Sequence, residues 1–436
     1  MNHRGISELE LACDEALKQL YPAGIPDEIS RRLGVEIGAL KMAEFEGLDA
    51  ADEFLLFKKL SAAAKHACCT LFLPGVEANS LLTYLLGFQG LNPMPAHYYC
   101  PRCGFYHEEP KTLAGIDLPM KICPQCGKPL RRDGFSLREE LVWAAGRTLS
   151  FEYRAPKRFH NVAQRVVEQH YAEQGRAVAL CGWHSNSGQT GITEFGWLVL
   201  PSGRTFEDYP AMQCVMADGK DCLYNDYDQI KSEGMKHVLL VDSDLLARLD
   251  AVQWESGVLA EDIPVEQLAG ITCLDLAMTN VLSDEDYYAL DCRKPMTFQG
   301  KADCISAAHD TWQDPYTDKV LSFEAISDYF IFRQCPFCTR DDAFDYLRTV
   351  YSNKDQALLD AENLRKGKCR HDPERYTHDD MPGKFRDFAQ YAAYLVPRSF
   401  GQQIMLHCMW LAWYFKLDRR AYSRAVWRSA GPAKAY

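Results

Sequence analysis

The sequence predicts an α+β protein in which a small four-cysteine module separates a helical start from a mixed middle and a helical second half. Three observations support this fold class. Apolar residues recur at helical spacing near the start, two Cys-x-x-Cys pairs follow, and short strand-like runs precede a second helical stretch. With 436 residues, of which 47% are hydrophobic, the chain has enough apolar side chains for two to four domains with buried cores.

Helices are expected from residue 6 to about residue 70, because apolar side chains there follow a helical period. Pro22, Gly24 and Pro26 interrupt the pattern and separate the first two helices. A second apolar stripe runs from Phe54 to Ala64. The first stripe consists of Leu9, Leu11, Ala16, Leu17 and Leu20.

Two similar pentapeptides form the four-cysteine module, Cys100-Pro-Arg-Cys-Gly104 and Cys123-Pro-Gln-Cys-Gly127. Four thiolates in two such pairs supply a closed tetrahedral sulfur shell, which suits structural zinc and leaves no open position for catalysis. The Pro and Gly favour a tight turn in each pair, and the 19 residues between the pairs are typical of zinc ribbons. Redox or disulfide use is the alternative. The predicted zinc ligands are Cys100, Cys103, Cys123 and Cys126.

Composition and charge argue against several classes of protein. The first residues alternate acidic and apolar side chains and lack the basic region of a signal peptide. The 17 cysteines, an odd number, fit a reducing compartment, and the longest apolar run, Ile404–Phe415, is too short to span a bilayer. A net charge of −12 argues against a surface that coats nucleic acid, although a local basic groove is compatible with it. We expect a soluble, cytoplasmic protein with no membrane partner.

Beyond the cysteine module the pattern changes to short runs that favour strands. Helices are expected again after about Asp262, and the stretch from Asp341 to Trp427 has helical character almost throughout. The strand-like runs are Thr148–Tyr153, Val178–Cys181, Gly196–Leu200 and His237–Val241.

The cysteine module resembles one known family closely. Asn92-Pro-Met-Pro-Ala-His-Tyr-Tyr-Cys-Pro-Arg-Cys103, with Cys123-Pro-Gln-Cys-Gly127 and Arg132-Asp-Gly134, is similar to the zinc module of the PolC-type bacterial DNA polymerase III catalytic subunit. Further matches follow in the family's order, so the resemblance covers roughly residues 50 to 427. These matches are Phe195-Gly-Trp-Leu-Val-Leu-Pro201, His237-Val-Leu-Leu-Val-Asp242, Cys338-Thr-Arg-Asp-Asp342, Arg365-Lys-Gly-Lys368, Val396-Pro-Arg398 and Tyr414-Phe-Lys416.

The resemblance implies a nucleotidyltransferase-type polymerase palm with an inserted four-cysteine zinc ribbon and a helical fingers-like C-terminal half. It also implies a truncated homologue that lacks the family's exonuclease, phosphoesterase and oligonucleotide-binding parts. The implied divisions are an N-terminal helical and first palm segment at 1–95, the zinc ribbon at 96–132, the palm core at 133–255 and a helical fingers-like region at 256–436.

The catalytic carboxylates of such a polymerase are mostly absent from this sequence. The family needs them to hold two divalent metals about 4 Å apart. By resemblance Asp242 stands at the third catalytic aspartate, whereas Gly146 and Thr148 stand where the first two should be. Glu152 cannot substitute for Thr148. At about 3.3 Å per residue, it lies about 13 Å beyond Thr148 on the same predicted strand. We therefore expect no catalytic Mg²⁺.

The loop that cradles the triphosphate in the family is also altered. Such a loop presents backbone N–H groups and hydroxyls to phosphate oxygens. The matching stretch here is Phe72–Ser80, in which Gly75 and Ser80 are retained and Glu77 adds a charge that would repel phosphate. Loss of the cradle together with metal ligands predicts lost catalysis.

Basic residues remain in the fingers-like region. By resemblance Arg365, Lys366, Lys368 and Arg398 would lie near the incoming nucleotide or the template, although Phe400 replaces the histidine that the family has there. The alternative is a solvated helix end whose cations interact favourably with the helix dipole.

Other cysteines allow further interpretations. Cys335, Cys338, Cys369 and His371 can form a second zinc site or be buried free thiols. Cys181 and His184 have the residue types of a thiolate–imidazole pair, but no orienting carboxylate is evident, which favours chance adjacency.

The sequence thus predicts a non-catalytic, zinc-containing relative of the polymerase, acting as a scaffold or as a weak, salt-sensitive DNA-binding protein, or bound to a protein partner. The alternative is an active DNA-directed DNA polymerase with relocated metal ligands. A decayed product without a present role is a third possibility.

Overall fold

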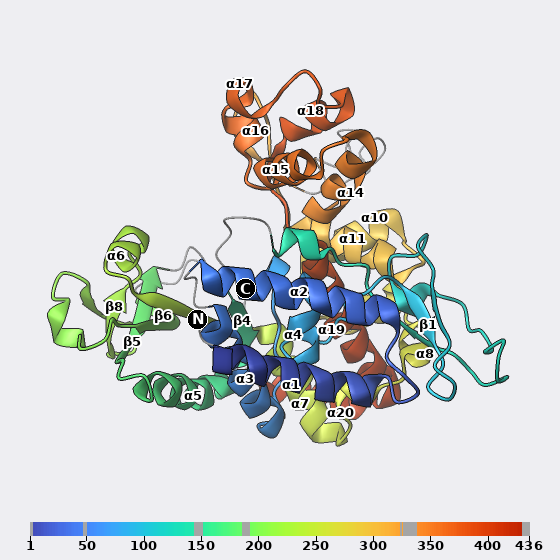
Figure 1. Cartoon of the computed structure of the whole chain (residues 1–436), viewed down its shortest axis with the longest axis horizontal. Coiled ribbons are helices and arrows are strands. Elements are labelled where there is room, and N and C mark those ends of the chain that lie inside the picture. The colour runs from blue at the N-terminus through green and yellow to red at the C-terminus, as the bar shows by residue number, and fades with distance from the viewer. Residues whose placement is uncertain are drawn as a thin grey trace.

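The computed structural model describes residues 3–46, 50–143, 151–184, 192–322, 325 and 338–429 (Figure 1). Helices and three separate sheets are present, so the predicted α+β class is confirmed. The assignment of the largest sheet to a polymerase palm, and the predicted domain divisions, stay predictions.

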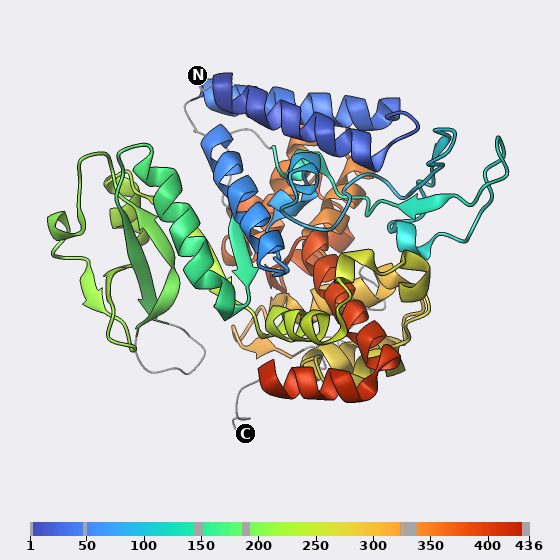
Figure 2. The same cartoon turned by 90° about the horizontal axis from the view of Figure 1, so that it is seen from below.

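Three helices form the start of the chain, and α3 packs against both α1 and α2 (Figure 2). The second begins after Pro26, whose φ of −61° suits the residue before a first helical turn. Leu9 and Leu17 are buried as the stripe predicts, but Leu11 is 60% exposed because it points away from the other helices. The three helices are α1 (His3–Leu20), α2 (Asp27–Phe45) and α3 (Ala50–His66).

A six-stranded sheet occupies the middle of the chain in the order β4-β9-β6-β5-β8-β7. Parallel pairing joins β4 to β9 and β5 to β8, and the other neighbours are antiparallel. The strands β4, β5, β6 and β9 overlap the four predicted runs. The first part of the run Thr148–Tyr153 lies outside the described residues, which omit 144–150. The strands are β4 (Glu152–Ala155), β5 (Val178–His184), β6 (Ile192–Val199), β7 (Gln213–Val215), β8 (Asp221–Tyr224) and β9 (Lys236–Asp242).

The hairpin of β7 and β8 was not predicted from the sequence. These strands have three and four residues, too few to show alternation. A turn signal was present in Asp218-Gly219, where Gly219 has φ +86° and the Met216 N–H donates to the Lys220 carbonyl at 2.8 Å.

Two longer helices and one short helix accompany the sheet. Ser243 directly follows β9 and caps α7 by accepting a hydrogen bond from the Leu246 N–H, and Gly257 ends that helix with φ +69°. This turn fixes where β9 ends and therefore where Asp242 lies. The helices are α5 (His160–Ala172), α6 (Tyr227–Ser232) and α7 (Asp244–Ser256).

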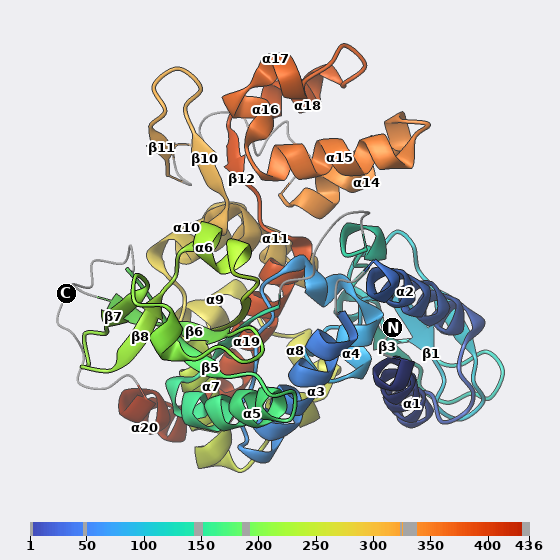
Figure 3. The ribbon, with the colours of Figure 1, turned by 60° about the vertical axis from the view of Figure 1, so that its left-hand side comes forward.

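Most of the second half is helical, with a small sheet in the order β11-β10-β12 (Figure 3). Hydroxyl caps begin several helices, as at Ser283 and Thr339. The elements are α8 (Val265–Leu268), α9 (Cys273–Met278), α10 (Asp284–Arg293), α11 (Phe298–His309), β10 (Thr311–Gln313), β11 (Val320–Leu321), α14 (Arg340–Val350), α15 (Lys354–Arg365), α16 (Lys368–His371), α17 (Pro373–Tyr376), α18 (Gly383–Ala389), β12 (Ala392–Tyr394), α19 (Arg398–Leu417) and α20 (Arg419–Ser429).

Helix α19 runs through the centre of the molecule and is buried over most of its length. It begins after Pro397, and Gly401 permits close packing on α11, since a Cβ there would lie 2.5 Å from the Ala302 carbonyl oxygen. Gln403 donates from Nε2 to the Leu73 carbonyl at 2.7 Å. The helix therefore joins the C-terminal half to the loop that precedes the zinc module.

No helix in the part of the chain that the structure describes is long and apolar enough to cross a membrane. The short helices not yet named are α4 (Leu81–Leu85), η1 (Val76–Asn79), η2 (Gly115–Asp117), η3 (Glu139–Leu141), η4 (Lys157–Phe159), η5 (Phe206–Asp208) and η6 (Ala260–Asp262).

Candidate functional site

The four predicted ligand cysteines lie together. Cys100 Sγ is 3.4 Å from Cys126 Sγ, and Cys103 Sγ is 3.5 Å from Cys123 Sγ. All four sulfurs lie within 4.8 Å of one another. In a tetrahedron with metal–sulfur bonds of about 2.3 Å, neighbouring sulfurs are about 3.8 Å apart. The cluster therefore has the size and the donor set to hold one zinc ion.

Each cysteine pair forms a tight knuckle. The Gly104 N–H donates to the Cys100 carbonyl at 3.0 Å, and the Gly127 N–H donates to the Cys123 carbonyl at 2.9 Å. Gly104 and Gly127 have φ of +77° and +70°, which L-residues with a side chain rarely adopt. The glycine after each second cysteine therefore allows the turn that points two sulfurs inward.

A three-stranded sheet supports the knuckles and anchors them to the N-terminal helices. Its strands are antiparallel, in the order β2-β1-β3. The guanidinium of Arg131 lies 5.3 Å from the Tyr21 ring centre and donates to the Leu20 carbonyl at 2.9 Å. The strands are β1 (His97–Tyr99), β2 (Tyr106–Glu108) and β3 (Arg131–Asp133).

The loop that matches the triphosphate cradle holds a carboxylate of this chain. Glu36 of α2 is fully buried and accepts hydrogen bonds from the Ser80 hydroxyl and from the N–H groups of Leu81, at 2.9 Å, and Leu82, at 3.4 Å. Arg32 lies 2.6 Å from the same carboxylate. The groups that would face a phosphate at this turn are therefore engaged by an internal anion.

The earlier part of the loop is closed as well. Glu77 is buried, and its Oε2 would lie 2.2 Å from a Cβ placed on Gly75, so its carboxyl group folds over that glycine. The Leu73 N–H donates to Gln403 Oε1 at 3.3 Å. A phosphate at this loop would meet two buried carboxylates and a backbone donor that is already paired.

Asp242 lies at the end of β9, where the resemblance places the third catalytic aspartate. Its Oδ1 is 2.9 Å from His160 Nε2, an ion-pair distance, and the other ring nitrogen of His160 is 3.4 Å from Glu194 Oε1. Burial alone would lower the pKa of His160, but the contacts with Asp242 and Glu194 outweigh it and raise that pKa to about 9. The imidazolium therefore bridges two carboxylates at neutral pH.

The neighbouring carboxylates do not complete a metal site with Asp242. In the register of β4 and β9, Asp242 lies opposite Ala155, whereas Glu152 lies opposite Leu239, about 10 Å away along the strand. Glu152 is 3.6 Å from Arg154. Gly146 and Thr148, which match the first two catalytic aspartates, lie outside the described residues.

The structure places Arg398 in the interior. This arginine is 2% exposed, and its Nη2 lies 2.7 Å from Asp342 and 3.0 Å from Asp345. Its Nη1 donates to the Ser136 carbonyl at 3.0 Å. Arg398 thus ties α19 to α14 and to the segment after the zinc module.

The other predicted cations lie near one another at the end of α15, and two of them contact the same carboxylate. Glu362 is 2.7 Å from Arg365 and 3.1 Å from Lys366. Lys368 lies 5.2 Å from the ring centre of Tyr376. Contact between these residues and nucleic acid stays a prediction. Arg365 and Lys366 share the single negative charge of Glu362, which also lies 3.2 Å from Arg340, so the carboxylate only partly neutralises them.

The remaining cysteine hypotheses find little geometric support. Cys335 lies outside the described residues, and Cys338, Cys369 and His371 do not form a metal-sized group within the described part of the chain. Burial raises the pKa of the Cys369 thiol to about 12, which opposes thiolate formation.

Sequence reasoning missed Glu36, His160 and Glu194. The spacing of four residues between Arg32 and Glu36 indicates an ion pair on one face of a helix. Nothing in the neighbouring sequence indicates that this pair contacts Ser80. His160 reaches Asp242 through the placement of α5, and Glu194 lies near it because β6 pairs with β9.

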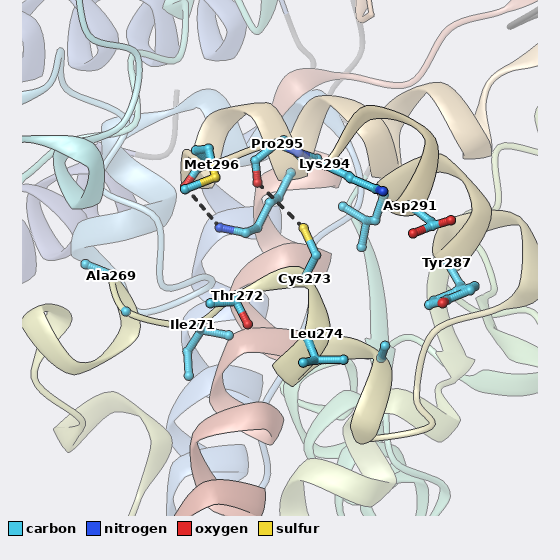
Figure 4. A pocket seen from close by; sticks show the side chains of 14 residues that line it. Ala269, Ile271, Thr272, Cys273, Leu274, Tyr287, Asp291, Lys294, Pro295 and Met296 are labelled. Atoms are coloured by element: carbon cyan, nitrogen blue, oxygen red, sulfur yellow. Dashed lines mark hydrogen bonds between the residues drawn. The ribbon is translucent and has the colours of Figure 1, made fainter.

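A surface pocket of about 410 Å³ lies apart from these residues, between α9, α10 and the start of α11 (Figure 4). Its walls are mostly apolar, and Lys301 donates to the Met296 carbonyl at 3.3 Å. Cys273 donates to the Pro295 carbonyl at 3.6 Å. These contacts close the inner wall of the pocket, and no convergent set of catalytic groups lines it.

Comparison with known proteins supports the family resemblance over part of the chain. The sequence is 32% identical to the DNA polymerase III PolC-type of Thermotoga maritima over 121 residues, which is 27% of this chain and 8% of that protein. It is 28% identical over 138 residues to that of Caldanaerobacter subterraneus subsp. tengcongensis, covering 31% of this chain and 9% of the relative. Identity to the Bacillus subtilis protein is 38% over 65 residues, covering 14% of this chain and 4% of the relative.

These matches confirm the predicted resemblance to PolC-type DNA polymerase III over roughly a quarter of the chain. The matched segments span less than a tenth of the length of these relatives. No family profile matches the chain.

Proposed function

We propose that this chain is a polymerase-related protein that does not transfer nucleotides and serves as a zinc-containing, nucleic-acid-binding scaffold. In this proposal the six-stranded sheet corresponds to the polymerase palm, and the chain acts in the cytoplasm in connection with DNA replication. The similarity to PolC-type polymerases supports the connection with DNA.

One observation carries the non-catalytic part of the proposal: the chain's own side chains already engage the groups that would bind substrate. Glu36 accepts from the Ser80 hydroxyl and two backbone N–H groups, and Glu77 covers Gly75. A triphosphate would have to displace a buried carboxylate that is paired with Arg32, at a high cost in free energy.

The scarcity of metal-binding carboxylates also supports the absence of catalysis. The family's reaction needs several carboxylates around two metals, and Asp242 is engaged by the cation of His160. Electrostatic stabilisation supplies most of the rate enhancement in phosphoryl transfer, so the loss of ligands should abolish turnover rather than slow it.

Zinc at the four-cysteine cluster has a structural role in this proposal. Cys100, Cys103, Cys123 and Cys126 would hold it, and four thiolates leave no open position for a water or a substrate. The bound metal supplies folding free energy to a module with a small core.

An active polymerase with relocated ligands is the second candidate, because the Asp242 side chain is 51% exposed and within reach of solvent ions. Primer extension separates the two candidates. We expect no incorporation above background when the purified chain is incubated with primer–template, the four nucleotides and Mg²⁺ or Mn²⁺, with a full-length PolC-type enzyme as positive control.

Incorporation that is abolished by Asp242→Asn would overturn the proposal. As a further test, Gly146→Asp combined with Thr148→Asp should not restore activity, because Glu36 and Glu77 still occupy the loop.

A further inference from the structure

The zinc module is basic although the chain as a whole is acidic. Residues 96–132 contain six Lys or Arg and three Asp or Glu, whereas the net charge of the chain is −12. A zinc ion with four thiolates carries two negative charges, so the metal-bound module still has a positive net charge. The excess is one positive charge, so this part of the chain lacks the surplus of acidic residues found in the chain as a whole.

Three cations of the module are exposed and not neutralised. Within the described residues no ion pair is found for Arg102, Lys111 or Lys128. A fourth cation, Lys121, is exposed and lies 2.6 Å from Glu109. The first three side chains can therefore meet an external anion without first breaking an internal ion pair.

The fold brings two of these cations together. Arg102 lies inside the first knuckle, and the Lys128 carbonyl accepts a hydrogen bond from the Cys123 N–H of the second at 2.7 Å. The knuckles meet at the metal cluster, where Cys103 and Cys123 Sγ atoms are 3.5 Å apart. In Figures 1 and 2 the loops of this module extend beyond the rest of the molecule, so they are accessible.

The same module also exposes apolar side chains and one ring. Met120 and Ile122 are 78% and 62% exposed. His107 is exposed and stacks on Phe105 with 27° between the ring planes. Proteins that bind nucleic acid without sequence preference combine cations for the phosphates with rings and apolar side chains against the bases. An acidic protein would need the cations but not the exposed imidazole and apolar side chains.

We propose that this surface of the zinc module, called the ribbon face, binds the sugar–phosphate backbone of a nucleic acid strand. This inference rests on the proposed function and assigns its nucleic-acid contact to the module rather than to the fingers-like region, where Arg365, Lys366 and Arg398 pair with carboxylates. The ribbon face consists of Arg102, His107, Lys111, Met120, Ile122 and Lys128.

The test is the affinity of the zinc-loaded full chain for a fluorescein-labelled duplex and single strand of about 20 nucleotides. Fluorescence anisotropy is measured from about 20 to 200 mM salt. Three phosphate contacts predict a slope of log affinity against log salt of about −2.7 on duplex DNA. The triple substitution Arg102→Gln, Lys111→Gln and Lys128→Gln should weaken binding at low salt at least tenfold and bring the slope close to zero.

A matched control removes the same charge from the fingers-like region through Lys354→Gln, Lys366→Gln and Lys368→Gln. We expect it to stay within about twofold of the wild type, since α15 and α16 lie in a different part of the molecule from the strand β1 of the zinc module (Figures 1 and 3), and salt screens charges that are far apart. Equal losses in both triple variants would show an effect of net charge alone, and a larger loss in the control would place the contact in the fingers-like region. Either result overturns the inference.

Two further outcomes separate this inference from the proposed absence of catalysis. No binding by the wild type at low salt would overturn the ribbon face while leaving a negative primer-extension result intact. Displacement of the labelled DNA by polyglutamate as readily as by unlabelled DNA of equal charge would identify an acidic-protein surface and also overturn it. Zinc content and melting temperature of both triple variants should equal those of the wild type, which excludes loss of folding as the cause.

Discussion

The zinc module and the helical C-terminal half both carry basic residues, yet they use them in opposite ways. In the module Arg102 and Lys128 are exposed and unpaired within the described residues. In the C-terminal half Arg398 is buried between Asp342 and Asp345. A run of Lys and Arg in a sequence therefore indicates positive charge, but burial and nearby carboxylates decide whether that charge faces solvent.

The two regions also differ in what stabilises them. The core of the module is a handful of side chains around Tyr98 and Leu118, too few for independent stability without a metal. The C-terminal half is organised around α19, which is buried along most of its length. In the function proposed here the metal stabilises the module and its surface cations are available for binding, whereas the packed helices use Arg398 to pair with Asp342 and Asp345.

The largest effect is expected from removing the metal ligands. Cys100→Ser combined with Cys103→Ser should abolish stoichiometric zinc binding and unfold the module, because metal-binding free energies of structural sites are about 10–16 kcal/mol in peptides. Elemental analysis of protein purified under reducing conditions and thermal unfolding measure both effects. Cys292→Ser, at an exposed cysteine outside the cluster, is the control. Full zinc content in the double variant would contradict the assignment of these ligands.

A smaller effect on the free energy of unfolding is expected at Arg398, in the helical C-terminal half. Replacing it by Met leaves Asp342 and Asp345 without their buried cation and should cost about 3–5 kcal/mol in the free energy of unfolding. Lys366→Met, at a partly exposed ion pair, should cost less than about 1 kcal/mol. Urea denaturation compares them. Equal small losses would mean that Arg398 is not a structural cation.

The smallest effect on the free energy of unfolding is expected at His160, beside the six-stranded sheet. This cation is also paired with carboxylates, but unlike Arg398 it loses its charge within an accessible pH range. Its pKa is raised to about 9, so its contribution to stability is full below about pH 6.5 and is lost between about 6.5 and 9. Allowing for the half-exposed Asp242, we expect a loss of about 1–2 kcal/mol in the free energy of unfolding.

His160→Gln should remove the pH dependence of stability between about pH 6.5 and 9. Urea denaturation at several pH values between about 6 and 10 tests it. A wild-type profile with the same slope as the variant would show that the imidazolium does not bridge Asp242 and Glu194.

The sequence by itself determined the features that depend on residues close together in the chain. Cys100 and Cys103 form a knuckle because Pro101 and Gly104 favour the turn between them, and helix starts such as Ser283 follow from a side chain that reaches three residues ahead. The α+β class followed in the same way, from periodicities that need no tertiary contact.

Only the tertiary structure decided which charges are used internally. Glu36 lies 44 residues from Ser80, His160 lies 82 residues before Asp242, and Asp342 lies 56 residues before Arg398. No local pattern pairs such residues, because their meeting depends on how helices and strands pack rather than on spacing along the chain. The sequence showed that the cradle had changed, and the packing of α2 showed what fills it.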